Sequence, residues 1–290
     1  MDWISGIQRA LDYIEDHITD ELDYGDIARQ AACSGYYFQR LFGILCGMSL
    51  GEYIRARRLT LAGIELAVTG AKIIDVALKY GYESPESFSR AFVRFHGVTP
   101  SEAKRDGSRL KSFSPLTVHI TLKGGQIMDY KIIEKESFTV LEKVESQSVE
   151  DDKHLNTVPD FWTRSHQDGT VKTLLEQTSD TAFIYGICYG NTPTDAKQFD
   201  YSIAAAYDAD KPIPKGFRIR QIPARTWVVF ECLGAMPEAI QGLWHRIYTE
   251  FFPTAEYQPT YEMDIEAYPA GEMNSADYRC EIWVPVAKNK

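Results

Sequence analysis

The first hundred residues place their apolar side chains with the period of an α-helix. From Phe38 to Leu45, apolar residues at i, i+3, i+4 and i+7 share one helical face, and the same spacing recurs from Phe88 to Phe95. Each of these two segments is therefore predicted to be an amphipathic helix that buries one face.

The two predicted helices are copies of one unit. A shorter helical stretch precedes each copy, and a helix that opens with Ser49 and Glu52 in capping-box spacing separates them. Identical residues recur at an offset of 50 in these pairs: Ser34/Ser84, Phe38/Phe88, Arg40/Arg90, Phe42/Phe92 and Gly47/Gly97. The sequence thus predicts helix, turn, helix twice, with the two units about 30 Å apart, which is close to one turn of B-DNA.

The charge of this region favours a nucleic-acid partner. The whole chain has a net charge of −10, but residues 27–112 carry +6, against −7 for residues 1–26 and −9 for residues 113–290. The basic excess therefore coincides with the repeated helices.

The outward faces of the two helices supply the candidate DNA contacts. Opposite or beside the apolar stripes stand short polar, aromatic and arginine side chains, and arginine on such a helix reads guanine or contacts phosphate. The predicted DNA-binding residues are Tyr36, Tyr37, Gln39, Arg40, Pro85, Glu86, Ser87, Ser89, Arg90 and Arg94.

These segments resemble the AraC/XylS family of transcription regulators. The resemblance is carried by GYYFQRLF from Gly35 and by IIDVALKYGYESPESFSRAFVRFHGVTPSEAKR from Ile73. It implies an all-α double helix-turn-helix domain of seven helices over residues 1–108. Glu86 beside Pro85 departs from the family pattern. An acid at this position can accept a hydrogen bond from cytosine, but it repels phosphate.

The rest of the chain has the two-residue period of β-strands. Residues 116–122 alternate apolar and polar positions and a Gly-Gly pair follows, which predicts a linker and connecting strand over 109–126. Beyond it, a second internal repeat pairs the stretch from Tyr130 with the stretch from Phe217. Each copy reads strand, strand, helix, strand, strand, so residues 127–290 are predicted to form an α+β domain of two pseudo-symmetric β-β-α-β-β units.

This second half resembles the GyrI-like effector-binding domains. The specific stretches are IPARTWVVFECLG from Ile222 and DYRCEIWVPV from Asp277. The resemblance implies a small-molecule pocket at the pseudo-two-fold, with Glu281 inside it. The residues alone leave two alternatives open: as the only charge in CEIWVPV, Glu281 either faces solvent on an edge strand or serves a site, on the same side as Trp283.

Four further aromatic residues are candidates for the same pocket. Trp162 and Trp244 pair in the second repeat, although a tryptophan at helical spacing is commonly a core residue. Tyr189 and Tyr268 also pair, at the ends of predicted strands. The expected ligand is a small amphipathic organic cation, and the predicted ligand-binding residues are Glu281, Trp283, Tyr268, Tyr189, Trp162 and Trp244.

Neither a cofactor nor a metal is expected. The six histidines have no metal spacing, the five cysteines are scattered without a CxxC pair, and no glycine-rich phosphate motif occurs. No run approaches 18 apolar residues, which predicts a cytoplasmic protein without a membrane partner.

The sequence therefore predicts a multidomain regulator of transcription that is not an enzyme. Its expected partners are double-stranded DNA and a small-molecule effector, with RNA polymerase as a further candidate. Two alternatives from other classes remain for the second half: a hydrolase that uses Glu281 as general base, and a module that binds a protein partner.

Overall fold

The computed structural model describes residues 3–105, 107–118, 127–148, 154–190 and 198–288. They divide into two compact units. The first comprises Met1–Gly35 and Cys46–Ile120, and the second comprises Tyr36–Leu45 and Thr121–Lys290. Residues 36–45, which the sequence assigns to the first domain, thus group with the second unit, and the domain boundaries at 108 and 127 stay a prediction.

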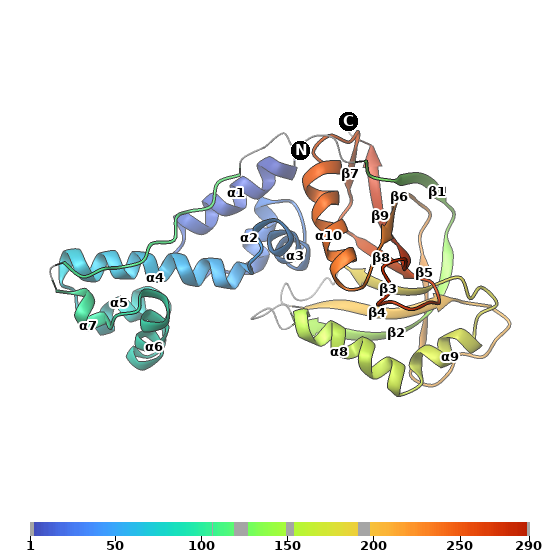
Figure 1. The fold of residues 1–290 in the computed structure, drawn as a ribbon, viewed down its shortest axis with the longest axis horizontal. Helices are drawn as coiled ribbons and strands as arrows, with labels where there is room; N and C mark the ends of the chain where they lie inside the picture. The colour runs from blue at the N-terminus through green and yellow to red at the C-terminus, as the bar shows by residue number, and fades with distance from the viewer. Residues whose placement is uncertain (1–2, 106, 119–126, 149–153, 191–197, 289–290) are drawn as a thin grey trace. The chain divides into compact units, whose positions relative to one another are not determined.

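Seven helices precede the first strand in the described part of the chain, as the sequence predicts. They are α1 (Trp3–Asp16), α2 (Tyr24–Gln30), α3 (Gly35–Cys46), α4 (Leu50–Thr69), α5 (Ile73–Lys79), α6 (Pro85–His96) and α7 (Pro100–Ala103). In the first unit, α4 is a long rod with α1 and α2 at one end and α5 to α7 at the other (Figure 1).

Capping residues set where these helices begin. Ser49 and Glu52 form a capping box on α4, because each side chain binds the backbone N–H of the other residue. Ser84 caps α6, with Pro85 at the first helical position. The predicted caps of α4 and α6 are confirmed.

The core around α6 follows the predicted stripe. Phe88 and Phe92 are fully buried, and Ala91 and Phe95 pack partly buried against the same cluster. The remaining buried members come from α4, α5 and α7 and their ends: Leu59, Ala62, Leu66, Val76, Ala77, Tyr80 and Ala103.

The segment after α7 lies against α4 instead of forming a strand. The Leu116 N–H donates to the Tyr53 hydroxyl and the Val118 N–H to Gln8 Oε1, so side chains take the hydrogen bonds that a neighbouring strand would supply. The predicted strand over 116–122 is therefore wrong for 116–118, and its remainder lies outside the described residues.

The second unit is built on an antiparallel sheet. Its strands lie in the order β1-β6-β9-β8-β3-β4-β2-β5, with β7 paired to β9. The strands are β1 (Tyr130–Lys135), β2 (Phe138–Ser148), β3 (Ile184–Tyr189), β4 (Gln198–Ala206), β5 (Arg218–Ile222), β6 (Arg225–Leu233), β7 (Tyr257–Pro259), β8 (Met263–Tyr268) and β9 (Arg279–Lys288).

Helices interrupt this strand sequence at equivalent points. They are α8 (His154–Gln167), α9 (Thr170–Glu176), α10 (Glu238–Arg246) and the π-helical turn η2 (Ile247–Phe251). The order β1-β2-α8-β3-β4 therefore matches β5-β6-α10-β8-β9, which confirms the predicted repeat with α9, η2 and β7 as additions.

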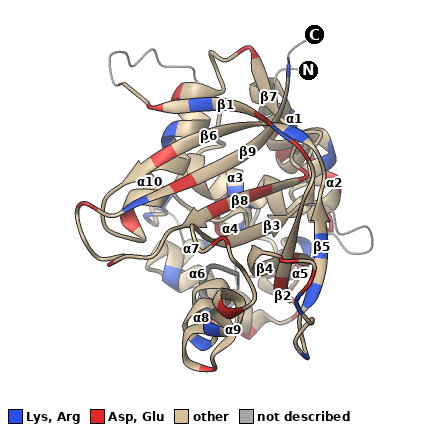
Figure 2. Ribbon diagram, turned by 90° about the vertical axis from the view of Figure 1, so that its right-hand side faces the viewer, with Lys and Arg blue, Asp and Glu red and all other residues tan. Residues whose placement is uncertain are grey.

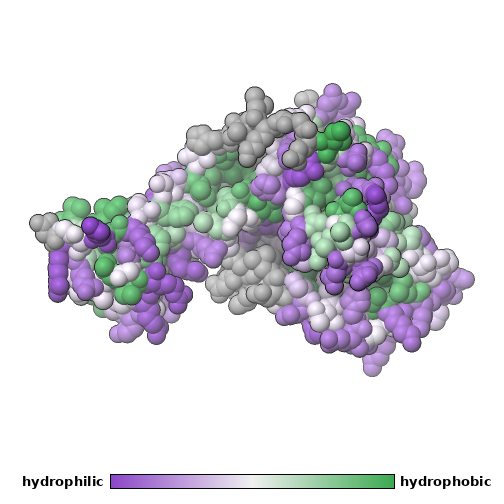
Figure 3. All heavy atoms as spheres, in the orientation of Figure 1, coloured by the Kyte–Doolittle hydropathy of each residue, from purple (hydrophilic) through white to green (hydrophobic). Residues whose placement is uncertain are grey.

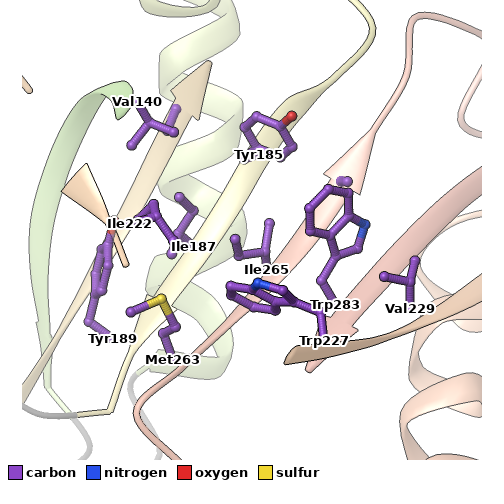
Figure 4. Close-up of a cluster of buried hydrophobic side chains, with 12 residues drawn as sticks. Val140, Tyr185, Ile187, Tyr189, Ile222, Trp227, Val229, Met263, Ile265 and Trp283 are labelled. Carbon is purple, nitrogen blue, oxygen red and sulfur yellow. The ribbon is translucent and has the colours of Figure 1, made fainter. Parts of the chain in front are cut away.

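The two faces of the sheet carry different side chains. One face, here called the apolar face, holds a cluster that includes Tyr185, Trp227, Ile265 and Trp283 from neighbouring strands (Figure 4). Because side chains alternate along a strand, the neighbours of Ile265 on β8 point to the opposite face. That opposite face, here called the helix face, is the one that α8 and α10 contact.

His96 anchors the segment after α7 and generates a prediction about pH. Its Nδ1 accepts from the Lys111 N–H and its Nε2 lies 2.9 Å from the Leu59 carbonyl, to which it donates as a neutral ring. Burial lowers the pKa of the His96 imidazole, and this outweighs the opposing effect of the Leu59 carbonyl. A histidine with a lowered pKa stabilises the fold above about pH 6.5, and this stabilisation is lost as the pH falls further.

We expect His96→Gln to lower the free energy of unfolding by about 1–2 kcal/mol at pH 7.5, through the lost hydrogen bonds. Thermal melts at pH 7.5 and 5.5 should show that acidification lowers the melting temperature more in the wild type than in this variant. His166→Gln, at an exposed position of α8, is the matched control. If the melting temperature falls equally between pH 7.5 and 5.5 in the wild type and in His96→Gln, the pH effect does not come from His96.

Candidate functional site

The helix α6 presents a charged face away from its core. Glu86, Arg90 and Arg94 are exposed at i, i+4 and i+8, whereas Phe88 and Phe92 are buried. Hydrophilic residues gather over this part of the molecule (Figure 3). The remaining predicted contacts on this helix, Pro85, Ser87 and Ser89, are half-buried.

The helix α3 presents its predicted contacts differently. Tyr36, Tyr37 and Gln39 are buried, and the side chain of Arg40 is 17% exposed. The partners of Tyr37 and Arg40 lie on β8, inside the second unit. The same residue type thus has two environments in the two repeats, exposed at Arg90 and enclosed at Arg40.

On the helix face of the sheet, two carboxylates lie among aromatic rings. Glu266 Oε1 accepts from Trp244 Nε1 at 2.8 Å, and Oε2 accepts from the Tyr268 hydroxyl at 2.9 Å. Asp264, two residues earlier on the same face, is 2% exposed. Figure 2 shows these acidic positions of β8 in red near the middle of the sheet.

Two further aromatic side chains complete this group. Trp162 Nε1 donates to the Tyr201 hydroxyl at 2.8 Å, and the Trp162 ring meets that of Tyr268 edge-on with 5.4 Å between centroids. The six residues that form the group, here called the effector cluster, are Trp162, Tyr201, Trp244, Asp264, Glu266 and Tyr268.

The hydroxyls of the cluster keep their protons. Burial, reinforced by the Glu266 carboxylate, raises the pKa of both Tyr268 and Tyr201 well above the ordinary value. A protonated hydroxyl can donate, and the Tyr268 hydroxyl donates to Glu266 Oε2. The cluster therefore presents net negative charge to whatever enters it.

Arg40 supplies positive charge to this cluster. Its Nη1 lies 2.8 Å from Asp264 Oδ2, its Nη2 lies 3.4 Å from Glu266 Oε1, and its guanidinium carbon lies 4.2 Å from the Trp244 ring centroid. Burial acts to lower the pKa of Arg40, but the two carboxylates more than reverse this effect, so its pKa stands above the ordinary value.

The other predicted ligand residues lie on the apolar face. Trp283 and Tyr189 belong to the apolar cluster, and Glu281 pairs across the strands with Ala267 of that same face. Glu281 Oε1 accepts from Lys131 Nζ and Oε2 from Trp283 Nε1, both at 2.8 Å. The structure thus brings Trp162, Trp244 and Tyr268 together, and it separates them from Glu281, Trp283 and Tyr189.

Sequence reasoning missed Asp264, Glu266 and Tyr201. The available signal was the strand MDIEAY, in which two acids alternate with Met263, Ile265 and Ala267. Two acids on one side of a strand from the middle of a sheet require partners on that side.

A separate cavity of about 610 Å³ lies near β1 and η2, and none of the predicted ligand residues lines it. Its lining residues are Met128, Tyr130, Ile132, Glu250, Phe251, Thr254, Ala255, Glu256 and Tyr257.

Among the described residues, no group of three or more His, Cys, Asp or Glu side chains is placed to hold a metal ion. No helix within the residues that the structure describes is both long and apolar enough to span a bilayer.

Two family models match the chain. The model described as "Integron-associated effector binding protein" matches residues 131–286, and the model described as "Helix-turn-helix domain" matches residues 27–106.

Curated relatives are similar to the first third or to the whole chain. The regulatory protein SoxS of Salmonella typhimurium is 42% identical over 96 residues, covering 33% of this chain and 90% of that protein. The HTH-type transcriptional activator AarP of Providencia stuartii is 41% identical over 95 residues, covering 33% of this chain and 70% of that protein. The right origin-binding protein of Escherichia coli is 25% identical over 303 residues, covering 99% of this chain and 100% of that protein.

Among solved structures, SAV2435 bound to tetraphenylphosphonium matches with a TM-score of 0.49 and 25% identity, covering 55% of this chain and 94% of that chain. The family matches, in contrast, span more than half of the chain in one case and most of α2 to α7 in the other. The chain therefore belongs to the integron-associated effector binding protein family, and it carries an AraC-type helix-turn-helix domain ahead of the part that this family model matches.

Proposed function

We propose that this DNA-binding transcription regulator senses an amphipathic organic cation at the effector cluster of its second unit. The observation that carries the proposal is the pair of carboxylates on one side of β8: Glu266 accepts from Trp244 and Tyr268, and Asp264 is 2% exposed. Trp162 meets the Tyr268 ring edge-on. The boundaries 1–108 and 127–290 are our proposed extents of the DNA-binding and effector-binding domains.

A cation gains three kinds of interaction in such a site. It pairs with carboxylates whose charge is poorly solvated, it lies over a tryptophan ring, and it brings apolar surface against the other rings. The Trp244 ring already has a cationic group over it at 4.2 Å, so the ring face is accessible to positive charge from within the second unit. A neutral molecule of the same shape gains only the last of these interactions.

The proposal moves the ligand-binding acid from Glu281 to Glu266. Glu281 faces Lys131, whose side chain is 58% exposed, so solvent screens that pair. The exposed fractions of the two glutamates are similar, 20% for Glu281 and 15% for Glu266, but the cation beside Glu266 is Arg40, whose side chain is only 17% exposed. Glu266 also accepts from Trp244 and Tyr268.

DNA recognition is proposed to use the exposed face of α6 together with α3. This is supported by Arg90 and Arg94, which are exposed on α6, the second helix of its helix-turn-helix unit, since that helix enters the major groove in such proteins. RNA polymerase remains a proposed partner. Two of the named relatives, AarP and SoxS, are regulatory proteins, which supports a role other than catalysis for this chain.

The ligand proposal predicts the effect of Glu266→Gln. This change keeps the shape of the side chain and removes its charge, so it should weaken binding of benzamidine, a planar aromatic cation, by about 2–5 kcal/mol. Binding of benzamide, its neutral counterpart, should change little. Isothermal titration calorimetry on the full chain measures both.

Glu281→Gln is the matched control, since it removes the same charge from the opposite face of the sheet. Melting curves check that both variants fold. If Glu281→Gln loses the benzamidine affinity and Glu266→Gln keeps it, the site lies on the apolar face and the proposal is wrong.

The DNA proposal predicts the effect of Arg90→Ala. If Arg90 reads guanine, binding to a duplex selected from a random pool should weaken by about 1–3 kcal/mol, with relaxed preference at one base pair. Fluorescence anisotropy with the selected duplex and a scrambled one measures this. Arg164→Ala, which removes an exposed arginine of α8, should leave both affinities unchanged. Full affinity in Arg90→Ala would remove α6 from the interface.

A further inference from the structure

Arg40 has the position of a bound ligand in the effector cluster. Its Nη1 donates to both Asp264 oxygens, at 2.9 and 2.8 Å, and its guanidinium carbon lies 4.2 Å from the Trp244 ring centroid. A planar cation held between carboxylates and a tryptophan face is the arrangement that the proposed effector would adopt.

The neighbours of Arg40 on α3 are also committed to this surface. The Tyr37 hydroxyl donates to Asp264 Oδ2 at 2.8 Å, and the Tyr36 ring stacks on Phe199 of β4 with 3.6 Å between centroids. His245 Nδ1 of α10 donates a hydrogen bond to the Ile44 carbonyl at 2.9 Å. The segment 36–45 is thus held by side-chain contacts near both of its ends.

The second repeat shows that the helix-turn-helix unit does not itself require this arrangement. Arg90 occupies the position equivalent to Arg40 at the offset of 50, and it is exposed on α6. The copies differ next to the arginine: Tyr36 and Tyr37 correspond to Glu86 and Ser87. Two aromatic residues favour burial in the second unit, whereas the equivalent acid is exposed and the equivalent serine is half-buried.

We propose, on the basis of the effector function above, that Arg40 is an internal occupant of the effector site and that the effector is a planar cation with N–H donors that displaces it. Guanidinium and amidinium groups meet that description, because they fork toward two carboxylates as Arg40 does. A quaternary cation, which has no N–H, cannot replace the hydrogen bonds to Asp264.

Displacement links the effector to DNA binding. While Arg40 occupies the cluster, its guanidinium is held by Asp264 and Glu266 and is not available to a base or a phosphate. A ligand that takes over these carboxylates releases Arg40, and by linkage DNA that engages Arg40 opens the cluster to the ligand. The effector therefore raises the affinity of the regulator for its DNA site.

The first test measures benzamidine binding to the full chain with and without the internal occupant. Removing a competitor raises the fraction of open sites, so Arg40→Ala should bind benzamidine about tenfold or more tightly than the wild type. Arg40→Gln, which keeps a long polar side chain without the charge, should show the same gain. Arg164→Ala, an exposed arginine elsewhere in the second unit, should bind as the wild type does.

The outcomes separate this inference from the proposed function. Benzamidine binding that is equal or weaker in both Arg40 variants, with melting curves that show a folded chain, overturns the inference and leaves the effector site standing. Loss of binding in Glu266→Gln supports the site in that case. Absence of benzamidine binding in the wild type and in both Arg40 variants overturns the proposed function and the inference together.

A second test follows the linkage to DNA. Saturating benzamidine should increase the affinity of the wild type for its selected duplex, whereas N-methylquinolinium, a planar cation without N–H donors, should increase it less. In Arg40→Ala, benzamidine should leave the affinity for the duplex unchanged. An equal increase in wild type and Arg40→Ala would show that the effector acts by another route.

Discussion

The arrangement of the second unit depends on two carboxylates that the middle of a sheet encloses. Asp264 and Glu266 are two residues apart on β8, so both side chains point to the helix face. Like charges at this separation destabilise each other, and burial removes the water that would otherwise stabilise them. Their stability therefore requires donors and a cation from other elements, which α10 provides through Trp244 and α3 through Tyr37 and Arg40.

The same unit contains another acid, Glu281, whose ion pair lies in a contrasting environment. Glu281 pairs with Lys131, whose side chain is 58% exposed, whereas the side chain of Arg40 is 17% exposed. Water and salt weaken the first pair, and the second is largely shielded from both. The carboxylate of Glu266 is accordingly joined to α3 through Arg40 and to α10 through Trp244 by contacts that solvent screens little.

Much of the fold could be predicted from local patterns. The caps at Ser49 and Ser84, the buried stripe of Phe88 and Phe92, and the duplicated strand-helix order all follow from spacings within one segment. The connecting strand over 116–118 could not be predicted correctly, because alternation does not reveal whether a neighbouring strand exists. There the backbone N–H groups of Leu116 and Val118 bind side chains of α4 and α1.

The candidate site was harder to predict, because strand parity decides which acid and which rings meet. Tyr189 and Tyr268 pair in the sequence repeat, yet Tyr189 donates to Glu142 on the apolar face and Tyr268 donates to Glu266 on the helix face. A shift of one residue in the alignment of two strands exchanges the faces of every side chain. The aligned positions therefore indicate on which strands the candidate residues lie, but not to which face of the sheet each side chain points.

The two copies of the repeated helix, α3 and α6, place the same residue types in different environments. Both copies keep the arginine and the buried phenylalanines, so each retains the features that suit a helix-turn-helix unit. Among the positions that differ, Tyr36 and Tyr37 replace Glu86 and Ser87, and they supply two aromatic rings and a hydroxyl that donates to Asp264. Tyr37 and Arg40 both donate to Asp264, so the residues one helical turn before the arginine help to decide whether it is enclosed, as Arg40 is, or exposed, as Arg90 is.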